Sequence, residues 1–227
     1  MQSGPYWIAF GDIHDNTARL GEIADLAGAA GVIITGDITI GGRVKQAERV
    51  LDAIAAINPR ILAQIGNMDH AEITDWLDGK GWNIHVDTRV LAPGVALMGV
   101  GASTVTPFGT PSEYPEARFA GWLQTAHAHV QEYPQLVLVS HQPPYGTACD
   151  RVGGGKHVGS TAVREFIERV QPAVCLCGHI HESAAVDTLG RTVVVNPGTL
   201  QAGGYARLWL EGGVPQVSLC SLGCCPA

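Results

Sequence analysis

Basic residues are scarce in this 227-residue sequence, which has 14 Lys and Arg, 21 Asp and Glu, and a formal net charge of −7. It contains no basic run and no basic helix face, so broad binding to the phosphate backbone of nucleic acids is disfavoured. No apolar run reaches the ~20 residues that a membrane-spanning helix needs. We therefore expect no general nucleic-acid partner and no membrane segment.

The sequence also lacks a secretory signal pattern, because an apolar segment begins almost at the N-terminus without a preceding basic region. The six cysteines do not show the paired spacing of a structural zinc site. Cys175 and Cys177 lie on an apolar segment, whereas Cys220, Cys224 and Cys225 are close to the C-terminus. We expect reduced thiols and a cytoplasmic protein, and the oligomeric state stays open.

Internal repeats and low-complexity linkers are absent, and 46% of the residues are hydrophobic. We expect one domain over residues 1–227, with 220–227 as a short tail. Hydrophobic periodicity predicts helices over residues 17–30, 44–57, 71–78 and 118–132, and a helix capped by Ser160 or Thr161 that runs to Val170. Strands are expected at 6–10, 32–35, 60–65, 84–86, 89–91, 95–100, 136–139, 173–177, 184–187, 192–195, 206–210 and 214–219. The alternation predicts an α/β fold with two facing mixed β-sheets flanked by helices.

Five of these apolar segments end in a small residue that precedes a side chain able to bind a metal ion. The side chains concerned are those of Asp12, His14, Asp37, Asn67, His141, His179 and His181. A single polar residue at a strand end is usually just a satisfied loop residue, but five such ends form a pattern. Sites in open α/β sheets form beyond the carboxyl ends of the strands, so we expect these side chains to converge.

Seven ligands are too many for one tetrahedral ion and suit two ions. If one carboxylate bridges the ions, each keeps an open position for water and substrate. Two carboxylates beside two divalent ions leave a local charge of about +2, which favours a phosphate and lowers the pKa of a bridging water to roughly 7. Nitrogen and oxygen ligands without a thiolate suit Mn, Fe, Zn or Co better than Mg alone.

The ordered set Asp12-x-His14, Gly36-Asp37, Gly66-Asn67, His141 and Gly178-His179-x-His181 resembles the calcineurin-like metallophosphoesterase superfamily. Residues 106–111 and 140–147 resemble its small prokaryotic phosphoesterases. The resemblance implies a four-layer αββα fold and hydrolysis of small phosphate mono- or diesters, nucleotides among them, by metal-activated hydroxide. It also implies that Asp12, His14 and His181 hold one metal, that Asn67, His141 and His179 hold the other, and that Asp37 bridges them.

Two features depart from the family pattern. Ile38-Thr39 follow Gly36-Asp37, where the superfamily usually has a further acidic or polar residue. Met68 stands where the superfamily usually has a histidine that acts on the leaving group, and a thioether cannot transfer a proton. His157, in the Gly-rich loop 150–159, is our candidate substitute, although a solvated loop histidine is an equal reading. Asp69 is expected to orient a neighbour, and His70 is a weaker candidate. The candidate catalytic residues are Asp37, Asn67, Asp69 and His157.

Two other functions stay open at this point. A metal-binding or interaction scaffold without catalysis is favoured by Met68 and opposed by the intact ligand set. A single-metal hydrolase of the amidase type is opposed by the number of ligands. The loops at 101–115 and 150–159 are expected to decide the substrate, with Arg118 and Lys156 as candidate phosphate contacts.

Overall fold

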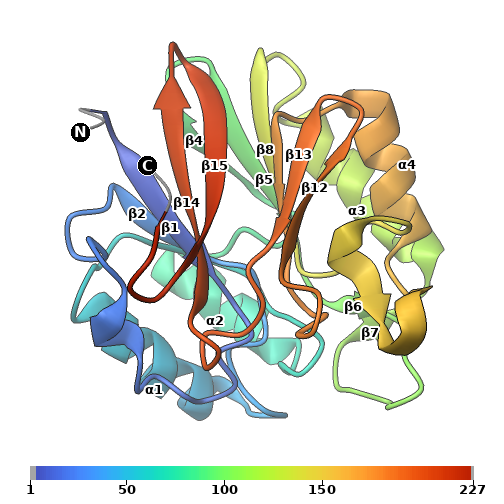
Figure 1. Ribbon diagram of the computed structural model, residues 1–227. Helices are drawn as coiled ribbons and strands as arrows, with labels where there is room; N and C mark the ends of the chain where they lie inside the picture. The colour runs from blue at the N-terminus through green and yellow to red at the C-terminus, as the bar shows by residue number, and fades with distance from the viewer. Residues whose placement is uncertain (1–3, 226–227) are drawn as a thin grey trace.

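Two mixed β-sheets face each other in the computed structural model, which describes residues 4–225 (Figure 1). The five-stranded sheet has the order β15 (Val214–Ser221), β14 (Gly204–Glu211), β1 (Tyr6–Phe10), β2 (Gly31–Ile34) and β3 (Ile61–Ala63). The six-stranded sheet has the order β12 (Ala185–Leu189), β13 (Thr192–Asn196), β11 (Val174–Leu176), β8 (Gln135–Ser140), β5 (Val95–Val100) and β4 (Thr88–Ala92). The α/β fold with two facing sheets is therefore confirmed.

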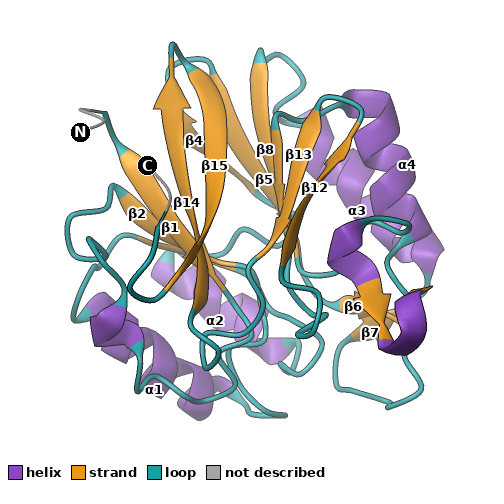
Figure 2. Cartoon of the chain, in the orientation of Figure 1, coloured by secondary structure: helices purple, strands orange, loops and turns teal. Residues whose placement is uncertain are grey.

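Helices cover the outer face of each sheet and complete the four layers (Figure 2). Helices α1 (Val44–Ala55) and α2 (Glu72–Lys80) pack on the five-stranded sheet, and α3 (Glu116–Ala128) and α4 (Thr161–Val170) pack on the six-stranded sheet. Helix α1 buries Ala47, Val50, Leu51 and Ile54, the spacing of a single helical face. No helix among residues 4–225 has the length and apolarity to cross a bilayer.

A separate apolar cluster fills the space between the two sheets. In β1, Ile8 and Phe10 face the helices while Trp7 and Ala9 face the second sheet, as the two-residue period of a strand requires. Val137 and Val139 of β8 meet this cluster from the opposite side. Each sheet is thus buried on both faces, which explains why its central strands are almost continuously apolar.

The strands that precede the candidate ligands are parallel within each sheet. Strand β1 pairs in parallel with β2 and β2 with β3, while β8 pairs in parallel with β5 and β11. Antiparallel pairing is found toward the edges, in β14, β15, β12 and β4. The carboxyl ends of the parallel strands therefore lie at one edge of each sheet, where the loops can meet.

Two of the expected elements are wrong. Residues 17–30 do not form a helix but only the short 3-10 turn η1 (Leu20–Glu22), because Asp25 has a positive φ of 60° that interrupts helical geometry. Leu20, Ile23 and Leu26 of this segment are nevertheless buried against the sheet. Residues 84–86 make only an isolated bridge at His85, and Val86 has a φ of 52°.

The C-terminal cysteines also differ from expectation. Cys220 is buried within β15 instead of lying in a tail, and it forms a disulfide with Cys225, so these two thiols are not reduced. Cys175 and Cys177 are free and buried, as expected for small apolar side chains. The last two residues, 226–227, lie outside the described part of the chain.

The packing of His85 predicts a pH-dependent stability. Its Nδ1 accepts a hydrogen bond from the Gly101 amide at 2.9 Å, its ring packs on Trp122, and burial lowers its pKa to about 4. As the pH falls, the His85 imidazole is therefore protonated in the unfolded chain at a higher pH than in the folded chain. As the pH falls from about 6.5 to 4, we expect the titration of His85 to lower the free energy of unfolding by up to ~3 kcal/mol.

Urea unfolding of the metal-free protein at several pH values measures this effect. His85→Gln keeps a hydrogen-bond acceptor but has no ionisation in this range, so the gap in unfolding free energy between the two proteins should narrow as the pH falls. A gap that does not change between pH 7 and pH 4 would contradict the assignment.

Candidate functional site

The seven candidate ligands lie on loops that follow β1, β2, β3, β8 and β11. Backbone hydrogen bonds join these loops: the Asp12 amide donates to the Gly36 carbonyl at 3.0 Å and the His14 amide to the Asp37 carbonyl at 3.1 Å. Asp12, His14, Asp37 and His179 have φ values of 48°, 49°, 49° and 67°. Such left-handed conformations are costly for residues with a side chain, so the surrounding hydrogen bonds must hold them in place.

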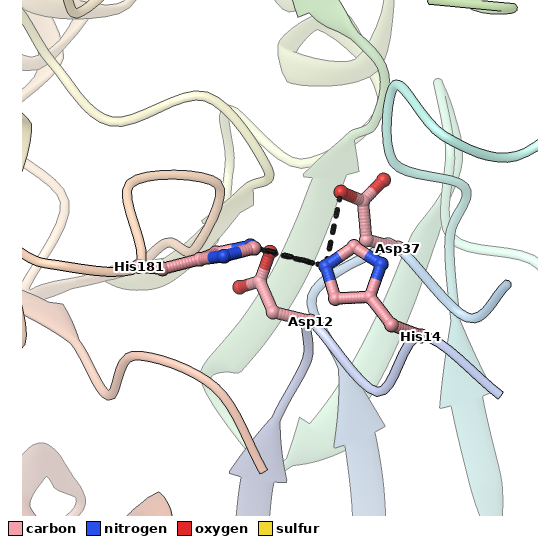
Figure 3. Close-up of side chains that lie close together, drawn as sticks. All are labelled: Asp12, His14, Asp37 and His181. Carbon is pink, nitrogen blue, oxygen red and sulfur yellow. Dashed lines mark hydrogen bonds and ion pairs between the residues drawn. The ribbon is translucent and has the colours of Figure 1, made fainter. Parts of the chain in front are cut away.

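Four side chains meet in the first group, Asp12, His14, Asp37 and His181 (Figure 3). Nε2 of His14 lies 3.0 Å from Nε2 of His181 and 3.7 Å from Oδ2 of Asp37, and Nε2 of His181 lies 3.2 Å from Oδ1 of Asp12. Lone pairs of nitrogen and oxygen thus point at one small volume.

A second group contains Asp37, His141 and His179. Nε2 of His141 lies 3.5 Å from Oδ1 of Asp37 and 3.0 Å from Oδ1 of Asn67. Within each group, every Asp and His offers one possible metal-ligand atom, and these atoms all lie within 4.8 Å of one another. The structure therefore brings all seven predicted side chains together, and Asp37 belongs to both groups.

The carboxylates of this cluster are buried without a basic partner of fixed charge. Asp12 is 1% and Asp37 is 2% exposed, and among residues 4–225 no Lys or Arg forms an ion pair with either. Isolated buried charges are expensive, so a cation is needed at this place. The donor set and its burial therefore fit divalent metal ions.

Histidine supplies the positive charge when no ion is bound. Burial would lower the pKa of His141, but the nearby Asp37 carboxylate raises it to about 9. Burial would raise the pKa of Asp37, but His141 and His14 together hold it below its ordinary value. Burial, followed by the proximity of His141, lowers the pKa of His179 to about 4, so its ring is already neutral and able to act as a ligand.

Asp69 lies behind the cluster and organises it. Its carboxylate accepts hydrogen bonds from the amides of Ile38, Thr39 and Gly66 at 3.0, 2.8 and 2.9 Å, and from the Thr39 hydroxyl at 2.8 Å. Burial, together with the charge of Asp37, raises its pKa to about 7. Asp69 is fully buried and does not line the cavity, so it holds the loops of Asp37 and Asn67 in register.

A cavity of about 1270 Å³ opens above the cluster, and its floor includes Asp12, His14, Asp37 and Asn67. The calcineurin-like phosphoesterase family model matches residues 8–183, which contain every candidate ligand. The chain belongs to this family.

One relative and two solved structures are similar to this chain. An uncharacterized protein of Methanocaldococcus jannaschii is 36% identical over 173 residues, which cover 73% of this chain and 76% of that protein. A structure from Thermus thermophilus is similar in fold, with a TM-score of 0.73, 18% identity, and coverage of 97% of this chain and 100% of that one. A dimetal phosphatase from Danio rerio has a TM-score of 0.60 and 11% identity, with coverage of 96% and 95%.

His157 is not among the residues that line this cavity. Nδ1 of His157 lies 2.6 Å from Oδ1 of Asp150, whose carboxylate also accepts hydrogen bonds from the amides of Gly146, Thr147 and Gly159. The cavity is lined by its neighbours Lys156 and Val158 instead. The geometry gives His157 a role in closing the base of loop 150–159, and its catalytic role stays a prediction.

The orientation of the Asn67 amide depends on contacts that sequence reasoning missed. Nδ2 of Asn67 donates to Oγ1 of Thr110 at 3.0 Å, and the Thr110 hydroxyl donates to Oε1 of Glu113 at 2.6 Å. Because the Thr110 proton is committed to Glu113, its oxygen accepts from Asn67, and Oδ1 of Asn67 is turned toward His141. Thr110 lies within residues 106–111, which the family resemblance includes, but its contact with Asn67 spans 43 residues and no spacing rule predicts it.

Thr110→Val removes the acceptor for the buried Asn67 amide while keeping the shape of the side chain. We expect Mn²⁺ affinity of the group that contains Asn67 and His141 to fall about 10- to 100-fold, as when other groups that orient metal ligands are lost. Thr110→Ser should restore it. Titration calorimetry, in which Mn²⁺ is added to the metal-free proteins, measures the affinity of each variant.

Thr106→Val is the matched control, because Thr106 also donates to Glu113 but makes no hydrogen bond with Asn67. It should leave metal affinity within about twofold of wild type. Equal losses in Thr106→Val and Thr110→Val would show that the loop as a whole matters, not the orientation of Asn67.

Proposed function

We propose that this protein is a dinuclear metal-dependent phosphoesterase that hydrolyses small phosphate esters. The observation that carries the proposal is the position of Asp37, whose carboxylate belongs to both groups of ligands. One oxygen faces His14 at 3.7 Å and the other faces His141 at 3.5 Å. A carboxylate in this position is suited to bridge two ions.

The ligands divide between two ions as the family resemblance implies. Asp12, His14 and His181 would hold one ion, Asn67, His141 and His179 the other, and Asp37 both. Divalent ions at such a centre supply an activated water and neutralise the charge that develops on a phosphoryl group. The mixture of imidazole and oxygen donors favours Mn, Fe, Zn or Co.

Other residues of the cavity would act on the substrate itself. Lys156 is the one Lys or Arg among residues 4–225 that lines the cavity, so it can hold a negatively charged part of the ester. Met68 also lines the cavity, and its amide donates to Oδ1 of Asp37 at 2.8 Å. Its backbone therefore helps to fix the bridging carboxylate, while its side chain cannot protonate a leaving group.

This lack of an acid supports a preference for activated esters or diesters over unactivated monoesters. It is also the observation that favours the second candidate, a metal-binding scaffold with little catalysis. Hydrolysis of bis(p-nitrophenyl) phosphate and p-nitrophenyl phosphate by metal-stripped protein, with and without added Mn²⁺, distinguishes the two functions. We expect turnover that requires Mn²⁺.

Asp37→Asn should lower kcat at least 100-fold, because it removes the charge shared by both ions. Asp25→Asn is the control, since this exposed carboxylate has a similar positive φ but lies outside the cavity. Turnover that persists in Asp37→Asn, or without metal, would contradict the proposal. Two bound ions with no turnover of either ester would favour the scaffold.

A further inference from the structure

An apolar surface adjoins the metal cluster within the same cavity. Ile40, Val105 and Phe108 line the cavity and are 61%, 72% and 84% exposed, and Met68 lies at the floor beside them. We call these four residues the apolar shelf. Scattered exposed hydrophobic residues are ordinary, but three large exposed residues around one cavity point to a binding surface.

Backbone hydrogen bonds connect the three segments that carry the shelf residues. The Gly41 amide donates to the Met68 carbonyl at 2.9 Å, which joins the segment of Ile40 to that of Met68. The Ser112 amide donates to the Asn67 carbonyl at 3.0 Å, which joins the loop of Phe108 to the same segment. The shelf therefore borders the Asn67 side of the metal cluster.

Loop 104–110 holds its apolar residues in a defined position. The Glu113 carboxylate accepts hydrogen bonds from the amide and hydroxyl of both Thr106 and Thr110, at 2.5–2.9 Å. These four bonds outweigh the effect of burial and lower the pKa of Glu113 to about 2. The Phe108 amide donates to the Thr106 hydroxyl at 3.1 Å. An aromatic ring is thus presented to solvent by a fixed loop, at little further cost in conformational entropy on binding.

The cavity lining also includes charged and polar side chains, together with the apolar Val152 and Val158. Lys156 stands on the hairpin of β9 (Arg151–Val152) and β10 (Lys156–His157), and Glu182 of the adjoining loop accepts a hydrogen bond from the Gly153 amide at 3.0 Å. The polar side chains of Gln142 and Gln201 also line the cavity. A volume of about 1270 Å³ is larger than a phosphate group requires and matches a ligand with an extended organic part.

We propose that the apolar shelf binds the alcohol part of the substrate, so that the preferred phosphate esters are those of large apolar alcohols. The inference rests on the proposed function, which places the phosphate at the metal cluster. Esters of small polar alcohols would leave Phe108 and Val105 in water and gain nothing from the shelf.

Binding of alkylphosphonates tests the shelf independently of catalysis. Methyl-, butyl- and octylphosphonate share one charged head and have no ester bond to break, and titration calorimetry on the Mn²⁺-loaded protein measures each Kd below the concentration at which the ligands aggregate. We expect octylphosphonate to bind at least about tenfold more tightly than methylphosphonate.

The variant Phe108→Ala/Val105→Ala should reduce this preference severalfold and leave the Kd of methylphosphonate within about twofold. Val90→Ala is the control, because Val90 is 61% exposed but lies on β4 outside the cavity. A Kd that does not depend on chain length, or a preference that survives the double variant, would overturn the inference.

The ester assay described above separates the two proposals. If bis(p-nitrophenyl) phosphate is hydrolysed but the Kd of the alkylphosphonates does not depend on chain length, the proposed phosphoesterase activity is supported and the proposed role of the shelf is wrong. If affinity follows chain length but no ester is hydrolysed, the shelf is supported as a ligand site and the proposed activity is wrong.

Discussion

The burial of two carboxylates, Asp12 and Asp37, is the constraint that the other features of the site satisfy. Each lies almost entirely out of water, with histidine as its only cationic partner among residues 4–225. Burying such charges costs several kcal/mol per ion unless opposite charge compensates. Without metal, the His141 imidazolium provides that charge, and an ion that takes this ligand must displace its proton. Metal binding by His141 would therefore release a proton.

Several residues of the surrounding loops hold the Asp37 carboxylate in its position. A Cβ at Gly66 would overlap Oδ1 of Asp37, so only glycine fits at this contact. The fully buried Asp69 then accepts three hydrogen bonds from the backbones of the Asp37 and Asn67 loops and a fourth from the Thr39 hydroxyl. The positive φ of Asp37 is stable only because these contacts over-determine the backbone. The same loops continue into the apolar shelf, so the metal-ligand cluster and the shelf share one framework.

Sequence reasoning predicted the sheets and the seven converging side chains because both follow from local rules. An apolar strand that ends in a small residue is visible in the chain, and parallel strands bring their carboxyl ends together. The prediction of a helix at 17–30 was wrong because the spacing of its apolar residues fits a packed irregular segment equally well. The left-handed backbone conformation of Asp25 cannot be predicted from composition. The pair Asn67–Thr110 depends on contact between two loops, and the pair His157–Asp150 depends on how one irregular loop folds, so no spacing rule could reveal either pair.

The account depends on two ions sharing Asp37. Electron paramagnetic resonance of the metal-stripped protein, titrated with Mn²⁺, tests this most directly because two ions joined by one carboxylate are magnetically coupled. We predict that two Mn²⁺ bind per chain with the spectrum of a coupled pair, and that Asp37→Asn abolishes the coupling. A single Mn²⁺ per chain at saturation, or two ions with independent spectra, would contradict the bridging role of Asp37.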